Sequence, residues 1–145
     1  VVARRCLLPA VGYYEWRAER PEGAAKPLKQ PYFLHPPSGL FVMAGLYEFW
    51  RGPDGWVSST TIITTSANEP MAEIHDRMPL ILPPAAWDEW LDPDQNDLAA
   101  LGRFLVPAPA SLITFHPVST EVNNVRNRGE HLTAATEPEV EPTTS

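Results

Sequence analysis

Residues 32–64 read YFLHPPSGLFVMAGLYEFWRGPDGWVSSTTIIT, and this stretch decides the predicted fold. It holds three runs of apolar, aromatic and β-branched residues, which are 32–35, 40–50 and 56–64. The sequences PPSG at 36–39 and GPDG at 52–55 lie between the runs. Runs of this kind, bounded by Pro and Gly, predict strands joined by tight turns. We therefore expect an antiparallel meander.

The residues before this stretch predict one more strand and a loop. Residues 7–17 carry a Pro and a Gly and then Tyr13, Tyr14 and Trp16, a composition typical of a strand entered through a turn. Residues 18–31 are polar and rich in Pro, Gly and Lys, which indicates a surface loop.

Helical signals follow the predicted strands. Ser66 and the glutamate three residues later have the spacing of a capping box, so a short helix is predicted from there to His75. Pro79 disfavours helical geometry at the residue before it. This predicts a turn at 76–78 that leads into an apolar strand at 80–82.

The rest of the chain completes the prediction of the fold class. Two helices are expected at 85–91 and 97–105, and a last strand at 112–118. Strands dominate and the helices do not alternate with them one to one, so the predicted class is α+β, rich in β-strand and mostly antiparallel. The length of 145 residues fits one domain with its own core.

The composition limits the kind of protein. Cys6 is the one cysteine, so neither an internal disulfide nor a cysteine-based zinc site can form. The sequence has no run of about 18 apolar residues, and we expect a cytoplasmic protein. The net charge of −7 argues against a surface that is basic throughout. A local basic groove around Arg77, Arg126 and Arg128 is compatible with this charge.

One acidic side chain stands in an aromatic strand. Glu15 is the only acid in its strand-like run, so loss of contact with water would let its carboxyl hold a proton near neutral pH. The simpler alternative, which this segment alone favours, is that Glu15 pairs with Arg17 or faces solvent. In strict strand alternation Glu15 and Trp16 point to opposite faces, so both can serve one site only at a strand end or a bulge.

His75 is the second candidate for chemistry, because imidazole exchanges protons at physiological pH. A capping or core histidine is the more common case. The neighbouring Arg77 could hold a phosphate, or it could pair with Asp76 or Glu73.

Metal and thiol chemistry receive less support. His35, His75 and His116 have no spacing typical of metal ligands, so no metal site is expected. Cys6 could act as a nucleophile with His75 as its base, but the apolar run around Cys6 favours an inert core thiol.

Four blocks of sequence together resemble the SRAP (SOS response-associated peptidase) family. They are RCLLPAVGYYEW at 5–16, TTSANEPM at 64–71, IHDRMPLIL at 74–82 and HPVSTEVNNV at 116–125. The second and third blocks are the most specific.

The resemblance implies a DNA repair protein that recognises abasic sites in single-stranded DNA. Such a protein binds the site covalently through a thiazolidine ring and has an associated autopeptidase activity. The resemblance places Glu15 and His75 in the active site as proton-transfer residues. It also implies that Arg77 contacts a DNA phosphate and that Trp16 faces the DNA as an aromatic surface. We add Asn124 as a DNA-binding candidate, and we expect no cofactor and no metal.

The nucleophile of the family is a cysteine directly after the initiator Met, and Cys6 does not match it. We therefore expect residues 1–132 to be the C-terminal part of a single SRAP domain, and residues 133–145 to be a disordered acidic tail. A monomer is expected.

Two other functions stay open on the sequence. One is a non-catalytic module that binds single-stranded DNA or a strand junction through Trp16, Arg77 and residues 124–128. The other is a thiol hydrolase in which Cys6 attacks and His75 is the base.

Overall fold

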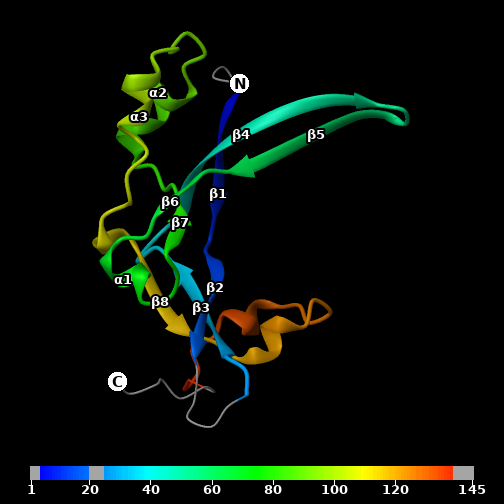
Figure 1. The fold of residues 1–145 in the computed structure, drawn as a ribbon, viewed down its shortest axis with the longest axis vertical. Coiled ribbons are helices and arrows are strands. Elements are labelled where there is room, and N and C mark those ends of the chain that lie inside the picture. Colours follow the sequence, from blue (N-terminus) through cyan, green and yellow to red (C-terminus); the bar gives the residue numbers. More distant parts are fainter. Residues whose placement is uncertain (1–3, 20–24, 139–145) are drawn as a thin grey trace.

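Two three-stranded antiparallel sheets form the frame of the fold, one above the other in Figure 1. The computed structural model describes residues 4–19 and 25–138. The upper sheet has the strand order β1-β4-β5, with bounds Arg5–Ala10, Phe41–Gly52 and Gly55–Ile62. The lower sheet has the order β2-β3-β8, with bounds Tyr13–Glu19, Leu28–His35 and Thr114–Pro117. The prediction of a strand-rich, mostly antiparallel α+β fold is confirmed.

The predicted meander is wrong at one connection. β4 and β5 form the expected hairpin, which closes at the pair Gly52↔Gly55, and Gly55 adopts a φ of 124° that suits glycine. β3 and β4, however, belong to different sheets, and β4 pairs with β1 instead. The two prolines at 36 and 37 lie between β3 and β4. They supply no backbone N–H and fix φ, so they redirect the chain instead of closing a hairpin.

The predicted loop at 18–31 is strand at both of its ends. β2 runs on to Glu19 and β3 begins at Leu28, while residues 20–24 lie outside the described residues. Gln30 is fully buried in the middle strand, where its amide nitrogen donates to the carbonyls of Pro31 and Val118, each at 3.0 Å. Because these bonds satisfy the amide, a polar residue is tolerated in a buried strand.

The segment after β5 differs from the prediction at both ends of its helix. β6 (Thr64–Ser66) contains Ser66, and α1 (Glu69–Ala72) is capped by Asn68. The side-chain oxygen of Asn68 accepts from the N–H of Met71 at 3.1 Å, and its amide donates to the carbonyl of Ala108 at 2.8 Å. Ser66 is therefore not the cap, because pairing with β7 holds it in extended geometry.

The next strand starts earlier than predicted. β7 (Arg77–Pro79) pairs with β6, so the expected turn at 76–78 is mostly strand. Residues 80–82 do not form a strand of their own, but they run beside β4 and make an isolated antiparallel bridge at Met43↔Ile81. The N–H of Ala44 donates to the carbonyl of Leu80 at 2.8 Å, and the N–H of Leu82 donates to that of Val42 at 2.9 Å. This segment thereby joins the β6–β7 pair to the upper sheet.

Short helices fill the rest of the chain. They are α2 (Trp87–Leu91), α3 (Leu98–Gly102) and four 3-10 helices, η1 (Pro84–Ala86), η2 (Ala110–Leu112), η3 (Thr120–Asn123) and η4 (Glu130–Thr133). The predicted helix at 97–105 is shorter than expected: Leu101 is buried, whereas Leu98 and Leu105 are 69% and 49% exposed. The predicted tail begins with ordered contacts, since the N–H of Thr136 donates to Pro117 at 3.0 Å, and residues 139–145 lie outside the described residues.

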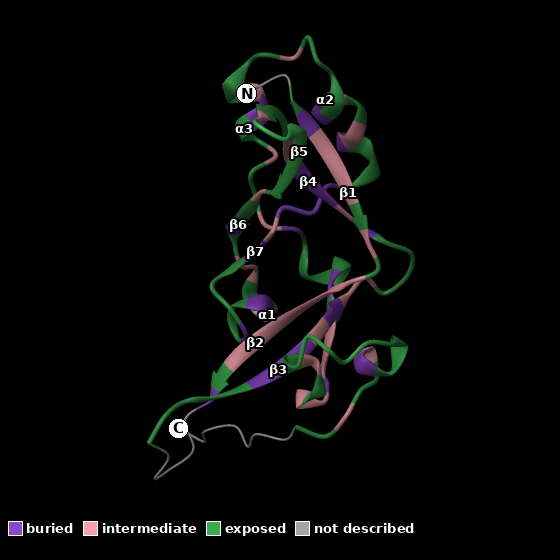
Figure 2. Cartoon of the chain, turned by 90° about the vertical axis from the view of Figure 1, so that its right-hand side faces the viewer, coloured by how far each residue is buried: buried purple, intermediate pink, exposed green. Residues whose placement is uncertain are grey.

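The buried side chains form two clusters, which the purple segments of Figure 2 follow. The first packs the lower sheet against α1 and β7 and includes Tyr32, Leu34, Met71, Ile74 and Met78. The second packs β4 against α2 and α3 and includes Ala44, Leu80, Leu82, Trp90 and Leu101. The first cluster fixes where α1 and the residues after it lie relative to β2 and β3.

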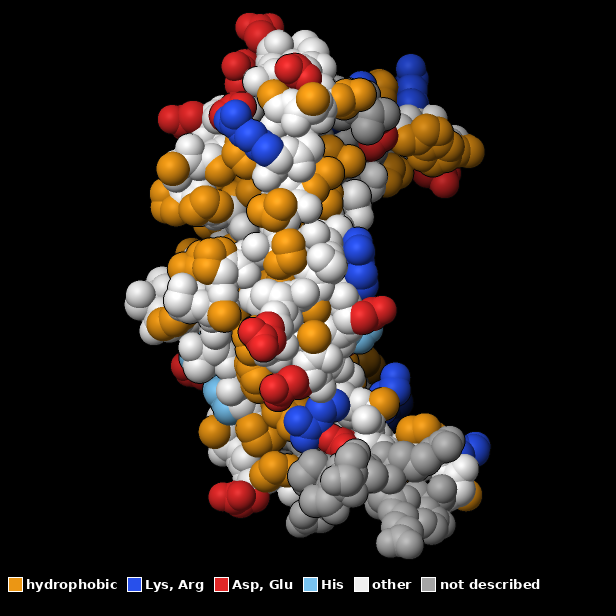
Figure 3. Space-filling view, turned by 60° about the vertical axis from the view of Figure 1, so that its left-hand side comes forward, with side chains coloured by type: hydrophobic (Ala, Val, Ile, Leu, Met, Phe, Trp, Pro, Cys, Tyr) orange, Lys and Arg blue, Asp and Glu red, His pale blue; other side chains and the backbone are white. Residues whose placement is uncertain are grey.

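The outer part of the β4–β5 hairpin stands away from both clusters, and hydrophobic side chains gather near its tip (Figure 3). Phe49, Trp50 and Trp56 are each more than half exposed there. None of the helices in the described part of the chain has the length and apolar character needed to cross a bilayer.

Candidate functional site

Glu15 lies in the middle of β2, on the face of the lower sheet that packs against α1. Its cross-strand partner is Tyr32, and the neighbouring pair is Tyr13↔Leu34. Tyr32 and Leu34 belong to the same buried cluster as Ile74 of the α1–β7 connection. We call this side the core face. Glu15 is therefore on the side of the sheet that packs against Ile74, the residue before His75.

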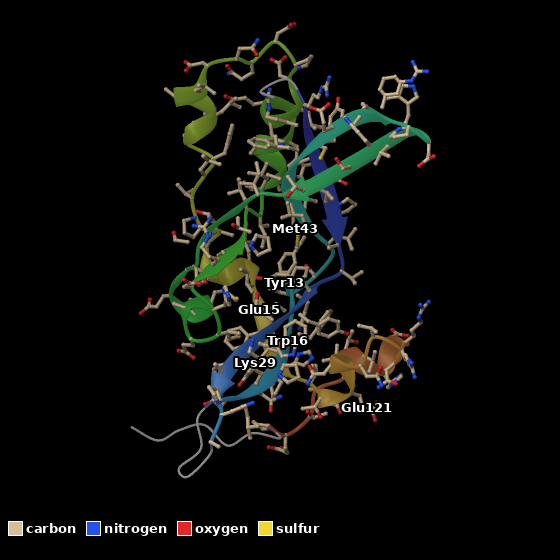
Figure 4. The ribbon with its side chains drawn as sticks, turned by 45° about the vertical axis from the view of Figure 1, so that its right-hand side comes forward. Tyr13, Glu15, Trp16, Lys29, Met43 and Glu121 are labelled. Atoms are coloured by element: carbon tan, nitrogen blue, oxygen red, sulfur yellow. The ribbon has the colours of Figure 1, made fainter. Side chains whose placement is uncertain are left out.

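Trp16 points to the opposite side of the lower sheet, which we call the outer face. The register from Tyr13↔Leu34 to Glu19↔Leu28 is regular, so β2 has no bulge at Glu15 or Trp16. Tyr14, Phe33 and His116 lie on this outer face, where the ring centroids of Tyr14 and Phe33 are 5.3 Å apart. Figure 4 shows Trp16 directed toward the segment that carries Glu121, away from Glu15.

The two faces nevertheless meet, because β2 is an edge strand of its sheet. Pro31, the partner of Trp16, has no N–H, and its carbonyl accepts from Val118 on the side of β8. The N–H of Trp16 therefore points away from β3, and the carboxylate oxygen of Glu15 accepts from it at 3.1 Å. The Glu15 carboxylate thus lies at the free edge of the sheet, beside the backbone of Trp16.

The ion pair considered for Glu15 does not form in the described structure. Arg17 donates instead to Glu19, whose carboxylate is almost fully buried, and its guanidinium lies 5.0 Å from the ring centre of Tyr32. Glu15 itself is half-buried, and its carboxylate bonds to the N–H of Trp16. Its carboxyl is therefore held in place by a neutral donor and not neutralised by an adjacent cation.

Tyr13 is a partly buried neighbour of Glu15 on the core face. Its ring packs on Phe41 with centroids 6.0 Å apart, and its hydroxyl is buried with no hydrogen-bond partner among the described residues. Burial, and secondarily the negative charge of Glu15, raises the pKa of Tyr13 well above its usual value. The charge of Glu15 is thus felt inside the core face.

His75 is exposed and directly follows the buried anchor Ile74. Its side chain is 44% exposed, and its Nδ1 atom lies 3.1 Å from the N–H of Arg77 and 3.2 Å from the Asp76 carboxylate. Neutral Nδ1 can accept from Arg77, whereas a protonated Nδ1 can donate to Asp76. Burial raises the pKa of Tyr32 and Arg17 lowers it, while the negative charges of Glu19 and of the nearby Glu73 raise it further. This places the end of α1 within electrostatic reach of the strand pair that holds Glu15.

Arg77 uses its guanidinium to bridge β7 and β6. It donates to the carbonyl and to the hydroxyl of Thr64 at 2.7 and 2.9 Å, and it makes no ion pair with Asp76 or Glu73 in the described structure. The side chain is exposed, so its remaining donors face solvent.

η3 and the loop after it lie on the outer face, and the adjacent Asn123 and Asn124 make different hydrogen bonds. Asn124, the residue expected to contact DNA, is exposed and accepts locally from the N–H of Arg126 at 3.1 Å. Asn123 reaches the sheet, where its side-chain oxygen accepts from the indole N–H of Trp16 at 2.7 Å. The sequence shows both asparagines, but only the backbone direction at the end of η3 decides which one meets Trp16.

The expected common basic groove does not form as one surface. Arg77 follows the core face of the lower sheet, while the exposed Arg126 and Arg128 belong to the loop on its outer face. A ligand that touched all three arginines would have to cross the free edge of β2, where the Glu15 carboxylate lies.

Cys6 is far along the fold from this edge. It lies in β1 opposite Gly45, and the indole of Trp90 donates to its carbonyl at 3.0 Å. Burial raises the pKa of the Cys6 thiol, which disfavours the reactive thiolate.

The described residues hold no group of three or more side chains arranged to bind a metal. His35 and His116 are 5.3 Å apart between ring centroids, and each ring bonds to a backbone carbonyl, of Pro36 and Thr133 respectively. These two histidines fasten loops to the lower sheet.

Comparison with known proteins gives a family. The sequence profile of the SOS response associated peptidase (SRAP) family matches residues 1–125. The abasic site processing protein YoqW of Bacillus subtilis is 40% identical over 134 residues, which are 91% of this chain and 58% of that protein. The abasic site processing protein HMCES of Xenopus tropicalis is 35% identical, over 91% of this chain and 43% of that protein.

A solved structure supports the same relation. A protein from Bacteroides thetaiotaomicron superposes with a TM-score of 0.81 at 27% identity, covering 94% of this chain and 59% of that protein. The chain thus spans about half the length of the relatives it matches. The resemblance seen in the four sequence blocks is confirmed, and the chain belongs to the SRAP family.

Proposed function

We propose that the domain to which this chain contributes recognises abasic sites in single-stranded DNA and becomes covalently joined to them. Relatives that carry the name abasic site processing protein support this proposal. The observation that carries it on this chain is the edge of β2, where the Glu15 carboxylate bonds to the outward N–H of Trp16 beside the core face that leads to His75.

Glu15 is the proton donor in this proposal. An abasic sugar is mostly a closed hemiacetal, so its ring oxygen must gain a proton before the aldehyde is released. Arg17 pairs with Glu19, and the Glu15 carboxyl is held at the edge of β2 by the N–H of Trp16. In this proposal the half-buried carboxyl of Glu15 gives that proton to the ring oxygen and takes it back later.

His75 is the second proton carrier. Capture of the aldehyde by an α-amine forms an imine and releases water, which requires protons to move to the departing oxygen. When the exposed imidazole of His75 is protonated, Asp76 can accept from Nδ1 and Nε2 can give its proton to the departing oxygen, which leaves a neutral ring. The same pair is the candidate for the associated autopeptidase step.

The DNA strand would be held on both sides of the edge. Arg77 offers free guanidinium donors to a phosphate on the core side, and Trp16 and Asn124 offer an aromatic ring and an amide on the outer side. No cofactor or metal enters this scheme, and we propose a cytoplasmic monomer.

The nucleophile of this proposal lies outside residues 1–145. Residues 1 to about 132 form the C-terminal part of the proposed domain. The nucleophile is an N-terminal cysteine whose α-amine forms the imine and whose thiol then adds to it, closing a thiazolidine. Cys6 does not serve, because it is in β1 and its thiol is held protonated by burial.

A non-catalytic single-strand or junction-binding module is the second candidate, and the exposed Trp16–Asn123 contact favours it as a minimal function of this chain alone. The Cys6/His75 thiol hydrolase is the weakest candidate, because the partners of His75 are Asp76 and Arg77.

The test is a covalent complex on a denaturing gel. A protein extended upstream of Val1 to a Met-Cys start is incubated with single-stranded DNA that contains one abasic site. We expect a heat-stable shifted band, and none when that N-terminal cysteine is replaced by alanine. The 145-residue chain should bind the same DNA weakly and without a covalent band. A covalent band from the 145-residue chain, or no band from the extended protein, would contradict the proposal.

A further inference from the structure

The indole of Trp16 is held by a side chain from a distant part of the sequence. Its N–H donates to the side-chain oxygen of Asn123 at 2.7 Å, across 107 residues. We infer that Asn123 is a positioning residue: it fixes the orientation of the Trp16 ring, and with it the loop that carries Arg126 and Arg128. The inference rests on the proposed function in so far as Trp16 contacts DNA.

The loop itself explains why Asn123 has this role and its neighbours do not. Ser119 caps η3 by accepting from the N–H of Glu121 at 3.2 Å, and Asn127 donates to the carbonyl of Glu121 at 2.9 Å. Asn124 accepts from the N–H of Arg126 at 3.1 Å. These bonds stay within the loop and set its shape. The bond of Asn123 is the one in this group that joins the loop to the sheet.

Few other contacts are available to fix the orientation of the Trp16 indole. Trp16 lies in the edge strand β2, on the outer face of the sheet, so one of its flanks has no neighbouring strand. An indole has a single polar donor, its N–H, and two side-chain torsions to fix. A hydrogen bond to Asn123 selects one orientation of the ring and leaves a ring face free for a base or sugar to stack on.

The same bond fixes the position of two cations. Arg126 and Arg128 are exposed, and they follow Asn123 by three and five residues. Val118 anchors the start of the loop through its N–H to Pro31 at 3.1 Å, and Asn123 anchors the end of η3. With both anchors in place the loop that carries the two arginines is tied to the outer face of the sheet, the side on which the Trp16 ring lies. Their guanidinium groups could then bind phosphates of a strand that stacks on this ring.

The first test needs no DNA. The indole N–H signal of Trp16 in the nitrogen-15 spectrum of the 145-residue chain is assigned with Trp16→Phe. We expect Asn123→Ala to move this signal and to speed its hydrogen exchange by up to about tenfold, the change that loss of a bond of ordinary net strength allows. Asn123→Asp keeps an acceptor oxygen and should preserve the slow exchange. The matched control Asn127→Ala should leave the signal in place. An indole signal unchanged by Asn123→Ala would overturn the inference whatever the DNA result.

The second test uses noncovalent binding to a labelled single strand with a stable abasic analogue. If Asn123 acts through Trp16, Asn123→Ala and Trp16→Ala each weaken binding, and the double variant is no weaker than Trp16→Ala alone. Weaker binding for Trp16→Ala but not for Asn123→Ala would overturn the inference and leave the proposed function intact. If Trp16→Ala has no effect while the indole signal still depends on Asn123, the contact of Trp16 with DNA fails and the positioning of the ring stands.

Discussion

The Nδ1 atom of His75 accepts a hydrogen bond from the backbone N–H of Arg77 at 3.1 Å. An acceptor nitrogen carries no proton, so neutral His75 in this geometry has its proton on Nε2. Nε2 is then the ring nitrogen that is not engaged by Arg77 or Asp76. The carboxylate of Asp76, 3.2 Å from Nδ1, becomes the alternative partner when the ring is protonated.

This relationship separates two roles of His75. His75→Asn places an amide oxygen where Nδ1 was, so it keeps the contact with Arg77 but cannot transfer a proton, whereas His75→Ala loses both. We expect both variants of the extended protein to crosslink at least about 100-fold more slowly, the usual effect of removing a general acid or base. Thermal unfolding should show His75→Asn as stable as the unchanged protein. Normal crosslinking by His75→Asn would exclude proton transfer by this residue.

Arg77 provides a prediction on DNA affinity. Its guanidinium bonds to Thr64 and is exposed, so Arg77→Ala should cost about 1 kcal/mol of stability or less. If Arg77 also holds a phosphate, the slope of log affinity against log salt should fall by about 1. Fluorescence anisotropy with single-stranded DNA measures this slope. Arg51→Ala, on the exposed hairpin, is the matched control and should leave it unchanged.

The helix cap can be tested by two substitutions. Asn68→Ala removes the bond to the N–H of Met71 and the bond to Ala108, so we expect a loss of about 1 to 2 kcal/mol in the free energy of unfolding. Ser66→Ala should change stability by less than about 0.5 kcal/mol, because Ser66 is exposed and does not cap α1. Urea denaturation decides between them, and the reverse order of effects would contradict the assigned cap.

Two glycines give opposite expectations for the same change. A Cβ on Gly45 would lie 2.8 Å from the carbonyl oxygen of Thr61 and 3.1 Å from the sulfur of Cys6, so Gly45→Ala should destabilise by about 1 to 3 kcal/mol. Gly102, in α3, has no neighbour within 4 Å of such a Cβ, so Gly102→Ala should stabilise by up to about 1 kcal/mol. Equal effects of the two changes on the urea midpoint would contradict the packing of β1 on β4.

Tyr13 gives a prediction on pH. Burial raises its pKa in the folded protein, so the unfolded chain ionises first as pH rises. The stability that depends on neutral Tyr13 is therefore complete below about pH 10 and is lost as pH rises further. Tyr13→Phe also removes a buried hydroxyl that has no partner among the described residues, so it should stabilise by about 1 kcal/mol at pH 7. Its advantage should grow above about pH 10, as followed by denaturation, and Tyr47→Phe is the control. A Tyr13→Phe protein less stable than the unchanged one at pH 7 would show that the hydroxyl has a partner.

Local sequence signals predicted those parts of the fold that local chemistry decides. The GPDG turn at 52–55 gives the β4–β5 hairpin, and the apolar runs locate most strands. The pairing of β4 with β1 across more than 30 residues carries no such signal, because prolines at 36 and 37 could equally end a strand or close a turn. The choice of Asn68 over Ser66 as cap depended on β6 pairing with β7, which is also a long-range contact.

The sequence named candidate residues, but it did not determine how they are arranged. Strand alternation correctly placed Glu15 and Trp16 on opposite faces, yet neither a strand end nor a bulge brings them together. Their one contact is between the Glu15 carboxylate and the backbone N–H of Trp16, which points outward because β2 is an edge strand. Asn123, and not Asn124, contacts Trp16, and only the direction of the chain after η3 decides this.

A double-mutant cycle on the crosslinking rate tests most directly whether Glu15 and His75 act together. Glu15→Gln and His75→Gln in the extended protein should each slow capture of an abasic single strand by about 100-fold to 10,000-fold. Because the two groups pass protons within one site, the double variant should be about as slow as the slower single variant. Losses that simply multiply, or an unchanged rate in either single variant, would mean that the two side chains do not share a site.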